Sequence, residues 1–377
     1  MMRLLPLLLL QQLLHLAAAP AAAAAAAAAP NFTFAVNWSS GGPDTTLPAA
    51  GFAVRKVEFI YYAPDRRTYA YADVINYTDP AYPESFGSEV GVFSSSDGRT
   101  SWLYHGIAIH RGALGGWDGG GVASPGAAVT ANGSVLVSYA AESQPAGGAK
   151  RAIGLAIAAH PLGPFTKLAP LASPALCASF ADPKVNCTDV RGCGSMCDDV
   201  IMQTRPGGEL HVYYSVKTYQ AGLGIYHTLS TDGGTSFRPA SLVLSPARNP
   251  SPGGGLPVEP IAGKFFPALM GGKGGMVLIT DGGPGWCLHA YVSRIPGDME
   301  NFVATAQPCL AASTRPPNWA QIQLAFVPSS DGEVASVGYA LWDVGGGESA
   351  AAGGGARVEP SGGVRGYSMR VFDFTLL

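Results

Sequence analysis

The sequence has few charged residues. Lys, Arg, Asp and Glu make up 13% of its 377 residues, about half of the share usual in soluble proteins, and the formal net charge is −3. A nucleic-acid-binding protein would carry a basic face, and no basic cluster is present, so we exclude a nucleic-acid partner. Beyond the first thirty or so residues no apolar run reaches the ~20 residues that a membrane-spanning helix needs. Helical periodicity is also missing, which argues against an α-helical fold.

The first 29 residues differ from the rest. A basic start at Arg3 precedes a mostly apolar stretch from Leu4 to Leu16, and the small residues Ala17–Ala19 follow. This layout is typical of a secretory signal peptide, here followed by an Ala-rich leader. Because the apolar stretch continues to Ala29, an uncleaved anchor is the alternative. We expect a secreted, extracellular protein that is a monomer and has no other membrane contact.

Two further features agree with the secretory route. Five Asn-x-Ser/Thr sequons are present, which accept glycans only on that route: Asn31, Asn37, Asn76, Asn132 and Asn186. The six cysteines, an even number, predict disulfide bonds in an oxidising compartment: Cys177, Cys187, Cys193, Cys197, Cys287 and Cys309. From proximity, the first four pair among themselves and the last two form the third bond. A zinc site in the four-cysteine cluster is the alternative, although the cluster has no C-x-x-C spacing.

Glycine and proline are abundant, with 50 and 30 residues, and aromatic residues make up 10% of the chain. This composition predicts many short strands joined by tight turns. The segment Glu209–Ser215 alternates between polar and apolar residues, as a half-buried strand would.

A hairpin-like unit recurs along residues 31–377. Each copy is an apolar strand, a turn and a second strand ending in aromatic residues, and the copies start near residues 57, 124, 199, 259 and 321. A turn motif recurs behind it in Ser95–Trp102 and Ser230–Phe237, with Gly154–Phe165 in the same place between them. Units of about 65 residues have the size of a four-stranded propeller blade. We therefore predict an all-β, five-bladed β-propeller in a single domain; a β-sandwich or jelly roll is the alternative.

Acidic residues recur at the starts of these units. Glu58 lies in the first, Asp118 precedes the second, Asp198 and Asp199 open the third, and Glu259 opens the fourth. The innermost strands of propeller blades converge on a central channel, so these carboxyl groups are expected to meet there. Hydrolysis of a glycosidic bond needs two carboxyl groups on either side of that bond, and a third carboxylate nearby can raise the pKa of the acid. The pattern predicts a glycosidase.

Several fragments resemble the five-bladed propeller glycosidases, namely glycoside hydrolase family 43 and its relatives, which include arabinanases, β-xylosidases and α-L-arabinofuranosidases. The fragments are Ile153–Lys167 with its Gly-Pro-Phe, Cys197–Met202 with Val212–Ser215, Val258–Ile261, and Trp117–Pro125. The resemblance implies an inverting mechanism with Asp118 as general base, Asp199 as pKa modulator and Glu259 as general acid. Inversion requires carboxyl groups about 6.5–9.5 Å apart.

Sugar rings bind to flat apolar surfaces, and Trp117, Trp286, Trp319 and Trp342 lie near unit starts or loop ends where they could provide them. His289 is a further candidate for lining the channel. No cofactor is expected. Some relatives hold a calcium ion in the channel, but the sequence contains no calcium-binding loop.

Two other functions compete with a glycosidase. A sialidase-like hydrolase would need an arginine cluster, for which Arg55, Arg205 and Arg315 are the candidates. A non-catalytic, carbohydrate-binding propeller would keep the aromatic residues without needing converging acids. For Glu58 and Asp118 there are also structural interpretations: Glu58 would pair with Arg55 or Lys56, and Asp118 would form an Asx-turn.

Overall fold

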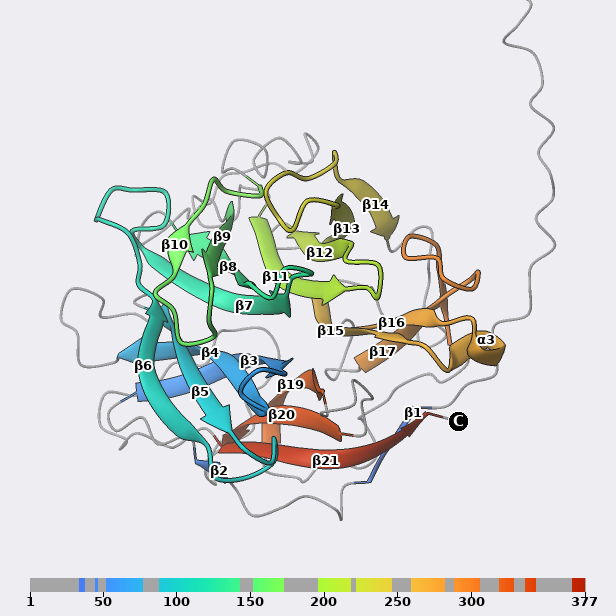
Figure 1. The fold of residues 1–377 in the computed structure, drawn as a ribbon, viewed down its shortest axis with the longest axis horizontal. Coiled ribbons are helices and arrows are strands. Elements are labelled where there is room, and N and C mark those ends of the chain that lie inside the picture. The colour runs from blue at the N-terminus through green and yellow to red at the C-terminus, as the bar shows by residue number, and fades with distance from the viewer. Residues whose placement is uncertain are drawn as a thin grey trace, which may run out of the picture.

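The protein is all-β and its sheets are arranged in a ring (Figure 1), with a cavity at the centre that is lined by one strand of each sheet. The computed structural model describes residues 34–37, 45–46, 52–76, 88–142, 152–172, 196–217, 222–245, 259–281, 288–305, 319–328, 336–343 and 368–376. Among these residues, no helix has the length and apolar character to cross a membrane.

Four sheets are antiparallel meanders of four strands. The first contains β3 (Phe52–Tyr62), β4 (Arg67–Asn76), β5 (Ser88–Ser95) and β6 (Leu103–Ile109). The second contains β7 (Gly121–Val129), β8 (Val135–Glu142), β9 (Ala152–Ala158) and β10 (Thr166–Lys167). The third contains β11 (Met196–Thr204), β12 (Leu210–Lys217), β13 (Gly222–Ser230) and β14 (Ser241–Leu244). The fourth contains β15 (Glu259–Phe266), β16 (Gly275–Asp281), β17 (Leu288–Ser293) and β18 (Phe302–Ala304), with the short α3 (Leu269–Gly272) after β15.

The fifth sheet combines segments that are far apart in the sequence. It contains β19 (Trp319–Val327), β20 (Ser336–Asp343), β21 (Ser368–Leu376), β1 (Phe34–Asn37) and β2 (Thr45–Thr46). Both β1 and β2 pair with β21, and Phe34 lies opposite Leu376. The first strands of the five sheets contact one another in the order β3, β7, β11, β15, β19 and then β3 again. These five innermost strands therefore form a closed wall around the channel.

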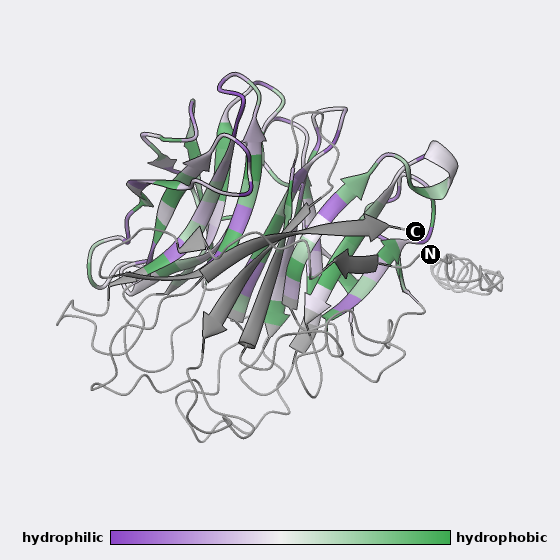
Figure 2. Cartoon of the chain, turned by 90° about the horizontal axis from the view of Figure 1, so that it is seen from below, coloured by the Kyte–Doolittle hydropathy of each residue, from purple (hydrophilic) through white to green (hydrophobic). Residues whose placement is uncertain are grey.

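The predicted propeller is confirmed, and each predicted unit start lies in one of these innermost strands. Figure 2 shows hydrophobic residues along the strands and hydrophilic residues in the turns at one edge of the ring. One core cluster fills the space between the first and second sheets, another lies between the second and third, and another between the third and fourth. Val57 and Phe59 pack with Ala325 and Val327, which joins the first sheet to the fifth.

The expectation of a half-buried strand at residues 209–215 was wrong. Every side chain from Leu210 to Val216 is less than 5% exposed. The polar members, His211 and Ser215, are buried as well, because neighbouring sheets cover both faces of the third sheet. Alternation in sequence here separates two buried faces and does not separate a buried face from a solvent-exposed one.

The predicted turn motif is confirmed in the first and third sheets. In both, a serine hydroxyl at the end of the third strand donates to an aspartate two residues later: Ser95 to Asp97 at 2.6 Å and Ser230 to Asp232 at 2.8 Å. Each aspartate then accepts backbone N–H groups of the following residues. The aromatic residue that ends the first copy, Trp102, is 5% exposed, so the turn fixes an aromatic plug in its sheet.

Candidate active site

Each innermost strand is interrupted by a β-bulge close to its start. The bulges lie between Val54 and Val57, Ala123 and Gly126, Asp198 and Val200, Pro260 and Ala262, and Trp319 and Ile322. A bulge leaves an extra residue unpaired and redirects its side chain, and bulges are frequent beside active sites. The five bulges therefore mark one level of the channel near the mouth at which the innermost strands begin, which we call the strand-start mouth.

Two of the bulged residues have an uncommon backbone conformation. Asp199 has a φ of 44° and Ser124 has a φ of 49°. A positive φ is rare for residues other than glycine, and it occurs where surrounding contacts hold the backbone in place. In Asp199 it accompanies a carboxyl group that is only 6% exposed.

The carboxylate of Asp199 forms an ion pair with the ammonium group of Lys56. Lys56 lies in the β3 bulge and Asp199 in the β11 bulge, and β7 lies between β3 and β11 in the ring. Both side chains are buried, with 4% and 6% exposure. The pair thus joins two innermost strands that are not neighbours. The opposite charge stabilises the ionised form of Asp199 where an unpaired carboxylate would be costly.

Two more buried acids lie at the level of this pair. The Asp198 carboxylate accepts the backbone N–H of Asp199 at 3.0 Å. Asp73 lies in β4 opposite the β3 bulge and accepts the backbone N–H of Ser124 at 2.6 Å. Asp73 and Asp198 are 3% and 2% exposed. In the described part of the chain, the level of the bulges therefore contains three carboxyl groups and one lysine. The sequence predicted Asp198 and Asp199 as site residues but not Asp73 or Lys56.

Glu259 is the first residue of β15, and β15 is the neighbour of β11 in the ring. The backbone of Glu259 lies opposite Asp281. Its side chain lies outside the described part of the structure. The fold thus places the starts of the strands carrying Asp199 and Glu259 side by side.

The structure places Asp118 in another cluster. Its carboxylate forms a 2.6 Å ion pair with Lys167, which lies in β10, the outermost strand of the second sheet. Burial raises the pKa of Tyr139, and the charge of Asp118 raises it further. The Trp117 ring stacks on Tyr139 with their centroids 6.1 Å apart. The carboxylate of Asp118 is thus engaged by Lys167, whereas that of Asp199 is engaged by Lys56.

The remaining candidates are spread over the molecule. His289 is 2% exposed in β17, the third strand from the channel. Trp319 and Trp342 lie in β19 and β20, but their side chains are outside the described residues, as is all of Trp286. Trp117 packs against the core of the first and second sheets.

The arginines of the sialidase alternative are not seen together. Arg205 follows the end of β11, roughly 20 Å along the strand from Asp199, and its guanidinium lies 5.0 Å from the centroid of the Phe265 ring. Arg55 lies in the β3 bulge near the opposite end of the channel, with its side chain outside the described residues, and Arg315 is not described.

Glu58 does not pair with Lys56, as one interpretation of the sequence suggested, because Lys56 is held by Asp199. The Glu58 carboxylate accepts the backbone N–H of Phe59 at 3.1 Å. Burial raises its pKa to about 8, while the Phe59 hydrogen bond and the charges of Lys56 and Lys264 act in the opposite direction. Glu58 follows the β3 bulge in the chain and lines the channel further from the strand-start mouth.

The described residues show no metal-binding group, and one cysteine lies beside the buried acids. Within the described ranges, no three His, Cys, Asp or Glu residues are grouped so that they could hold a metal ion. The expectation of no cofactor, with calcium in the channel as the weaker alternative, is not tested by this. Cys197, next to Asp198, is disulfide-bonded. The other five cysteines lie outside the described residues, so the predicted pairing is not tested.

Known structures share this architecture. No family model matches the sequence, and no curated protein matches it. Zg3597, a family 117 glycoside hydrolase from Zobellia galactanivorans, superimposes with a TM-score of 0.56 at 17% identity, over 91% of this chain and 90% of that one. The endo-arabinase of Bacteroides thetaiotaomicron gives 0.54 at 14% identity, over 87% and 96%. The GH43_1 enzyme of Xanthomonas citri, solved with xylotriose, gives 0.53 at 13%, over 80% and 85%. The expected resemblance to propeller glycosidases is confirmed at the level of the fold.

Proposed function

We propose that this protein is a glycoside hydrolase that cleaves a polysaccharide or oligosaccharide at the strand-start mouth of the channel. The fifth sheet then serves as the fifth blade of the propeller. The observation that carries the proposal is the buried, charge-paired Asp199 in a bulge, on a strand whose neighbour begins with Glu259. Burying an ionised carboxylate is costly, and active sites are places where such groups are maintained.

Glu259 is the general acid of this proposal and protonates the leaving oxygen. The contact with Lys56 favours the ionised form of Asp199. As a modulator, Asp199 then raises the pKa of the general acid through the repulsion between like charges. For the base, which activates water in an inverting mechanism, we favour Asp73 over Asp118. Asp73 lies at the level of the ion pair, whereas Asp118 is held by Lys167. Inversion is checked by NMR of the anomer released first from the substrate.

The function is tested with the purified protein on chromogenic arabinosides, xylosides and galactosides. Glu259→Gln is expected to lower kcat by about 10²-fold or more, in line with the contribution of a general acid. Glu209→Gln is the matched control, because this glutamate is 42% exposed in the turn after β11. Equal activity of Glu259→Gln and the wild type would remove Glu259 from the mechanism.

The two candidates for the base are separated by a second pair of variants. Asp73→Asn is expected to abolish turnover while Asp118→Asn retains most of it, provided that both variants keep the thermal stability needed for the assay. The opposite result would return the role of base to Asp118.

A carbohydrate-binding propeller without catalysis is the second candidate. One observation favours it: Lys56 already neutralises a carboxylate that a hydrolase would use. In that case oligosaccharides bind, as measured by calorimetry, but no substrate in the screen is cleaved.

We also propose the secretory route for this chain. The signal-like start of the sequence, the disulfide-bonded Cys197 and an exposed sequon support it. Asn132 lies exposed in the turn after β7, where its Oδ1 accepts hydrogen bonds from Thr130 and Ser134 at 2.6 and 3.1 Å. Expression in a secreting eukaryotic cell should give a protein in the medium whose mass falls on enzymatic deglycosylation and falls less in Asn132→Gln.

A further inference from the structure

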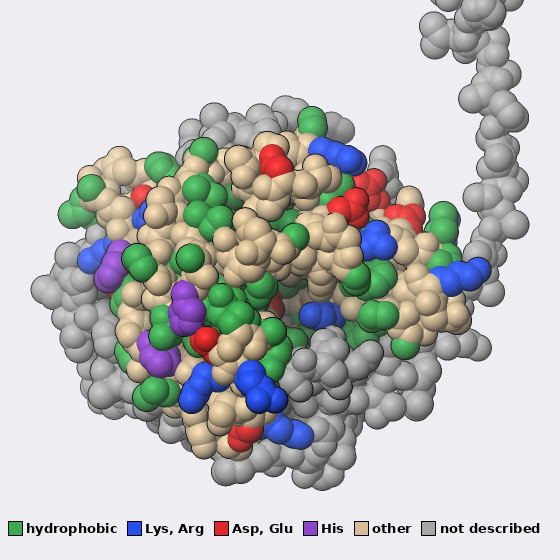
Figure 3. All heavy atoms as spheres, viewed as in Figure 1, with side chains coloured by type: hydrophobic (Ala, Val, Ile, Leu, Met, Phe, Trp, Pro, Cys, Tyr) green, Lys and Arg blue, Asp and Glu red, His purple; other side chains and the backbone are tan. Residues whose placement is uncertain are grey.

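The channel has a second opening, on the side where turns connect the first and second strands of each sheet. Figure 3 shows this face, which is hollowed near its centre, with a basic side chain visible in the hollow. The cavity here has a volume of about 210 Å³. Its lining comes from all five innermost strands, for example from Glu58, Val129, Gln203, Lys264 and Phe326. We call it the turn-side cavity.

The turn-side cavity lies beyond the ion pair of the candidate active site. Its lining on β3 begins at Glu58, two residues after Lys56, and on β11 at Met202, three residues after Asp199. Neither Lys56 nor Asp199 lines it. The cavity is therefore distinct from the strand-start mouth, and a ligand there would not occupy the proposed catalytic position.

Most polar groups in the cavity wall are already engaged. The Gln203 amide donates to the carbonyl oxygen of Thr204 at 2.5 Å, and its oxygen accepts the Phe265 N–H at 3.4 Å. The Thr204 hydroxyl donates to the carbonyl oxygen of Val129 at 2.8 Å. Apolar side chains of Phe59, Met202 and Phe326 complete the wall. The charged groups of the wall that face a ligand are the Glu58 carboxyl and the Lys264 ammonium.

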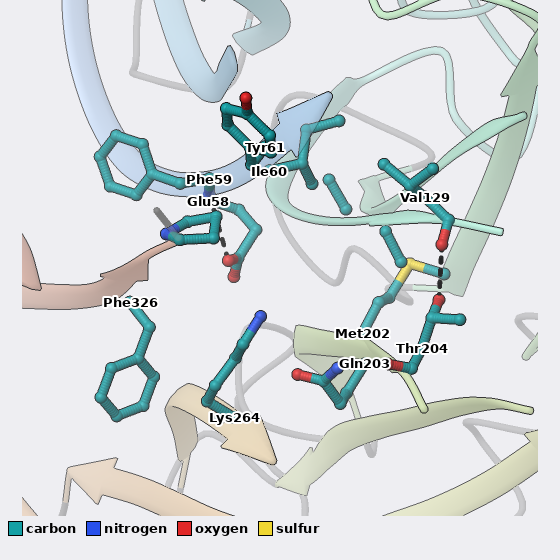
Figure 4. A pocket seen from close by; sticks show the side chains of 14 residues that line it. Glu58, Phe59, Ile60, Tyr61, Val129, Met202, Gln203, Thr204, Lys264 and Phe326 are labelled. Carbon is teal, nitrogen blue, oxygen red and sulfur yellow. Dashed lines mark hydrogen bonds between the residues drawn. The ribbon is translucent and has the colours of Figure 1, made fainter. Parts of the chain in front are cut away.

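Glu58 and Lys264 extend toward each other from β3 and β15 across the space of the cavity (Figure 4). Among the described residues, Lys264 forms no hydrogen bond or ion pair, and Glu58 is the group whose charge acts on it. Burial lowers the pKa of Lys264, whereas the Glu58 carboxylate raises it. Lys264 is thus a half-buried ammonium group that no counter-ion contacts among the residues the structure describes.

The protonation of Glu58 decides which charge the cavity presents. With a pKa of about 8, Glu58 is mostly protonated at neutral pH, so the cavity keeps the positive charge of Lys264 and gains an O–H donor. The charged groups that act on Glu58 are Lys56 on its own strand and Lys264 on β15. Two donors and one positive charge in a partly apolar cavity suit an anion that accepts hydrogen bonds.

We propose that the turn-side cavity binds a small carboxylate anion of the size of one uronic acid, with Lys264 as its counter-ion and Glu58 as a hydrogen-bond donor. The volume is below the roughly 300–1,000 Å³ of pockets for drug-sized ligands, so the ligand is small. The proposal does not depend on catalysis at the other mouth.

The two-group site has a characteristic pH dependence. As the pH rises past the titration of Glu58, its carboxylate becomes the counter-ion of Lys264 and repels the ligand. Binding is therefore tight on the acidic side and weak on the alkaline side, although the ligand itself stays ionised throughout.

The test is isothermal titration calorimetry of the full-length protein with galacturonate, and with galactose as the uncharged control. We expect galacturonate to bind at pH 6.5, to bind at least tenfold more weakly at pH 9.5, and galactose not to bind at this site. Glu58→Gln should lose less affinity between the two pH values than the wild type, because only Lys264, whose pKa burial lowers, still titrates in the site. Equal affinity of the wild type at both pH values would overturn the role of Glu58.

Variants of the lysines locate the site. Lys264→Met is expected to lose galacturonate binding, whereas Lys273→Met, which removes an exposed lysine between β15 and β16, should bind like the wild type. Lys264→Gln serves if the methionine variant does not fold. Glu259→Gln should also keep galacturonate binding, which separates this site from the proposed catalytic one. Unchanged binding in a folded Lys264 variant, or equal binding of galactose, would refute the proposal.

Discussion

Two pairs of a lysine and a carboxyl group in the described part of the channel differ in whether the two side chains are in contact. Near the strand-start mouth, Lys56 and Asp199 are in direct contact and almost fully buried. In the turn-side cavity, Lys264 and Glu58 lie apart across open space, and burial shifts the pKa of each toward its neutral form. The comparison teaches that the same two residue types give a fixed ion pair or a titratable binding site, depending on whether the backbone brings them into contact.

Removal of Lys56 should have the largest effect on stability. Lys56→Met removes the ammonium group that faces the buried Asp199 carboxylate, and we expect a loss of about 3–5 kcal/mol in the free energy of unfolding. Urea denaturation measures it. The double variant Lys56→Met/Asp199→Leu should recover much of the loss, because the buried carboxylate is removed as well. A loss below about 1 kcal/mol in the single variant would mean that the contact is not closed in solution.

A third buried pair extends the comparison to acid. His211 and His227 share a 2.9 Å hydrogen bond, and burial lowers the pKa of both to about 4. The unfolded chain binds these protons from about pH 6.5 downward, so stability falls as the pH drops from 6.5 to 4, by up to roughly 3 kcal/mol for each histidine. His211→Gln/His227→Gln should flatten this part of a pH–stability profile. His110→Gln, with its side chain 71% exposed, is the control and should leave the slope unchanged.

Glu58 should give the opposite slope. Its pKa is raised in the folded state, so the folded protein binds the proton more tightly than the unfolded chain, and stability falls as the pH rises from about 4.5 to 8. Because the carboxyl group faces an open cavity, we expect a change of roughly 2 kcal/mol and not the full value of the shift. Thermal melts of the wild type and Glu58→Gln at pH 5 and 9 measure it. Parallel behaviour of the two proteins would show that Glu58 is ionised in the fold at neutral pH.

Removal of Lys264 should have the smallest effect. Lys264→Met at pH 7 removes a half-buried charge that forms no ion pair among the described residues, so we expect a change within about 1 kcal/mol, in contrast to Lys56→Met. Urea denaturation of the two methionine variants side by side is the most direct test of the comparison. A large loss in Lys264→Met would place a hidden counter-ion beside this lysine.

The repeated units could be predicted from the sequence because each unit is formed by residues that are close together in the chain. A hairpin of apolar residues with a turn needs only neighbouring residues, and the predicted starts at 57, 124, 199, 259 and 321 all lie in innermost strands. The turn aspartates Asp97 and Asp232 were recognisable for the same reason. Burial of both faces of β12 was not readable, because it depends on sheets that are distant in the chain.

The site was only partly predictable. Asp198 and Asp199 were found because they lie at a unit start. Lys56 was missed as a site residue, because its partner is 143 positions away and nothing next to it indicates a charge pair. Asp73 lies well inside its strand, and its position opposite the β3 bulge becomes visible only in the register of the strands. Asp118 was expected at the channel, but Lys167 of β10 binds its carboxylate.

The pairing of β1 with β21 also has a consequence for the order of assembly. The fifth sheet is completed by residues 34–37 and 45–46 against residues 368–376, so this sheet stays incomplete during synthesis until that late segment is available. Until then β20 has an open outer edge and β1 and β2 lack the strand they pair with, so these early strands must wait for a contact of very high sequence separation, which is slow to form. Deleting residues 368–376 should therefore yield a chain in which the edge of β20 is exposed and prone to pair with another copy of itself.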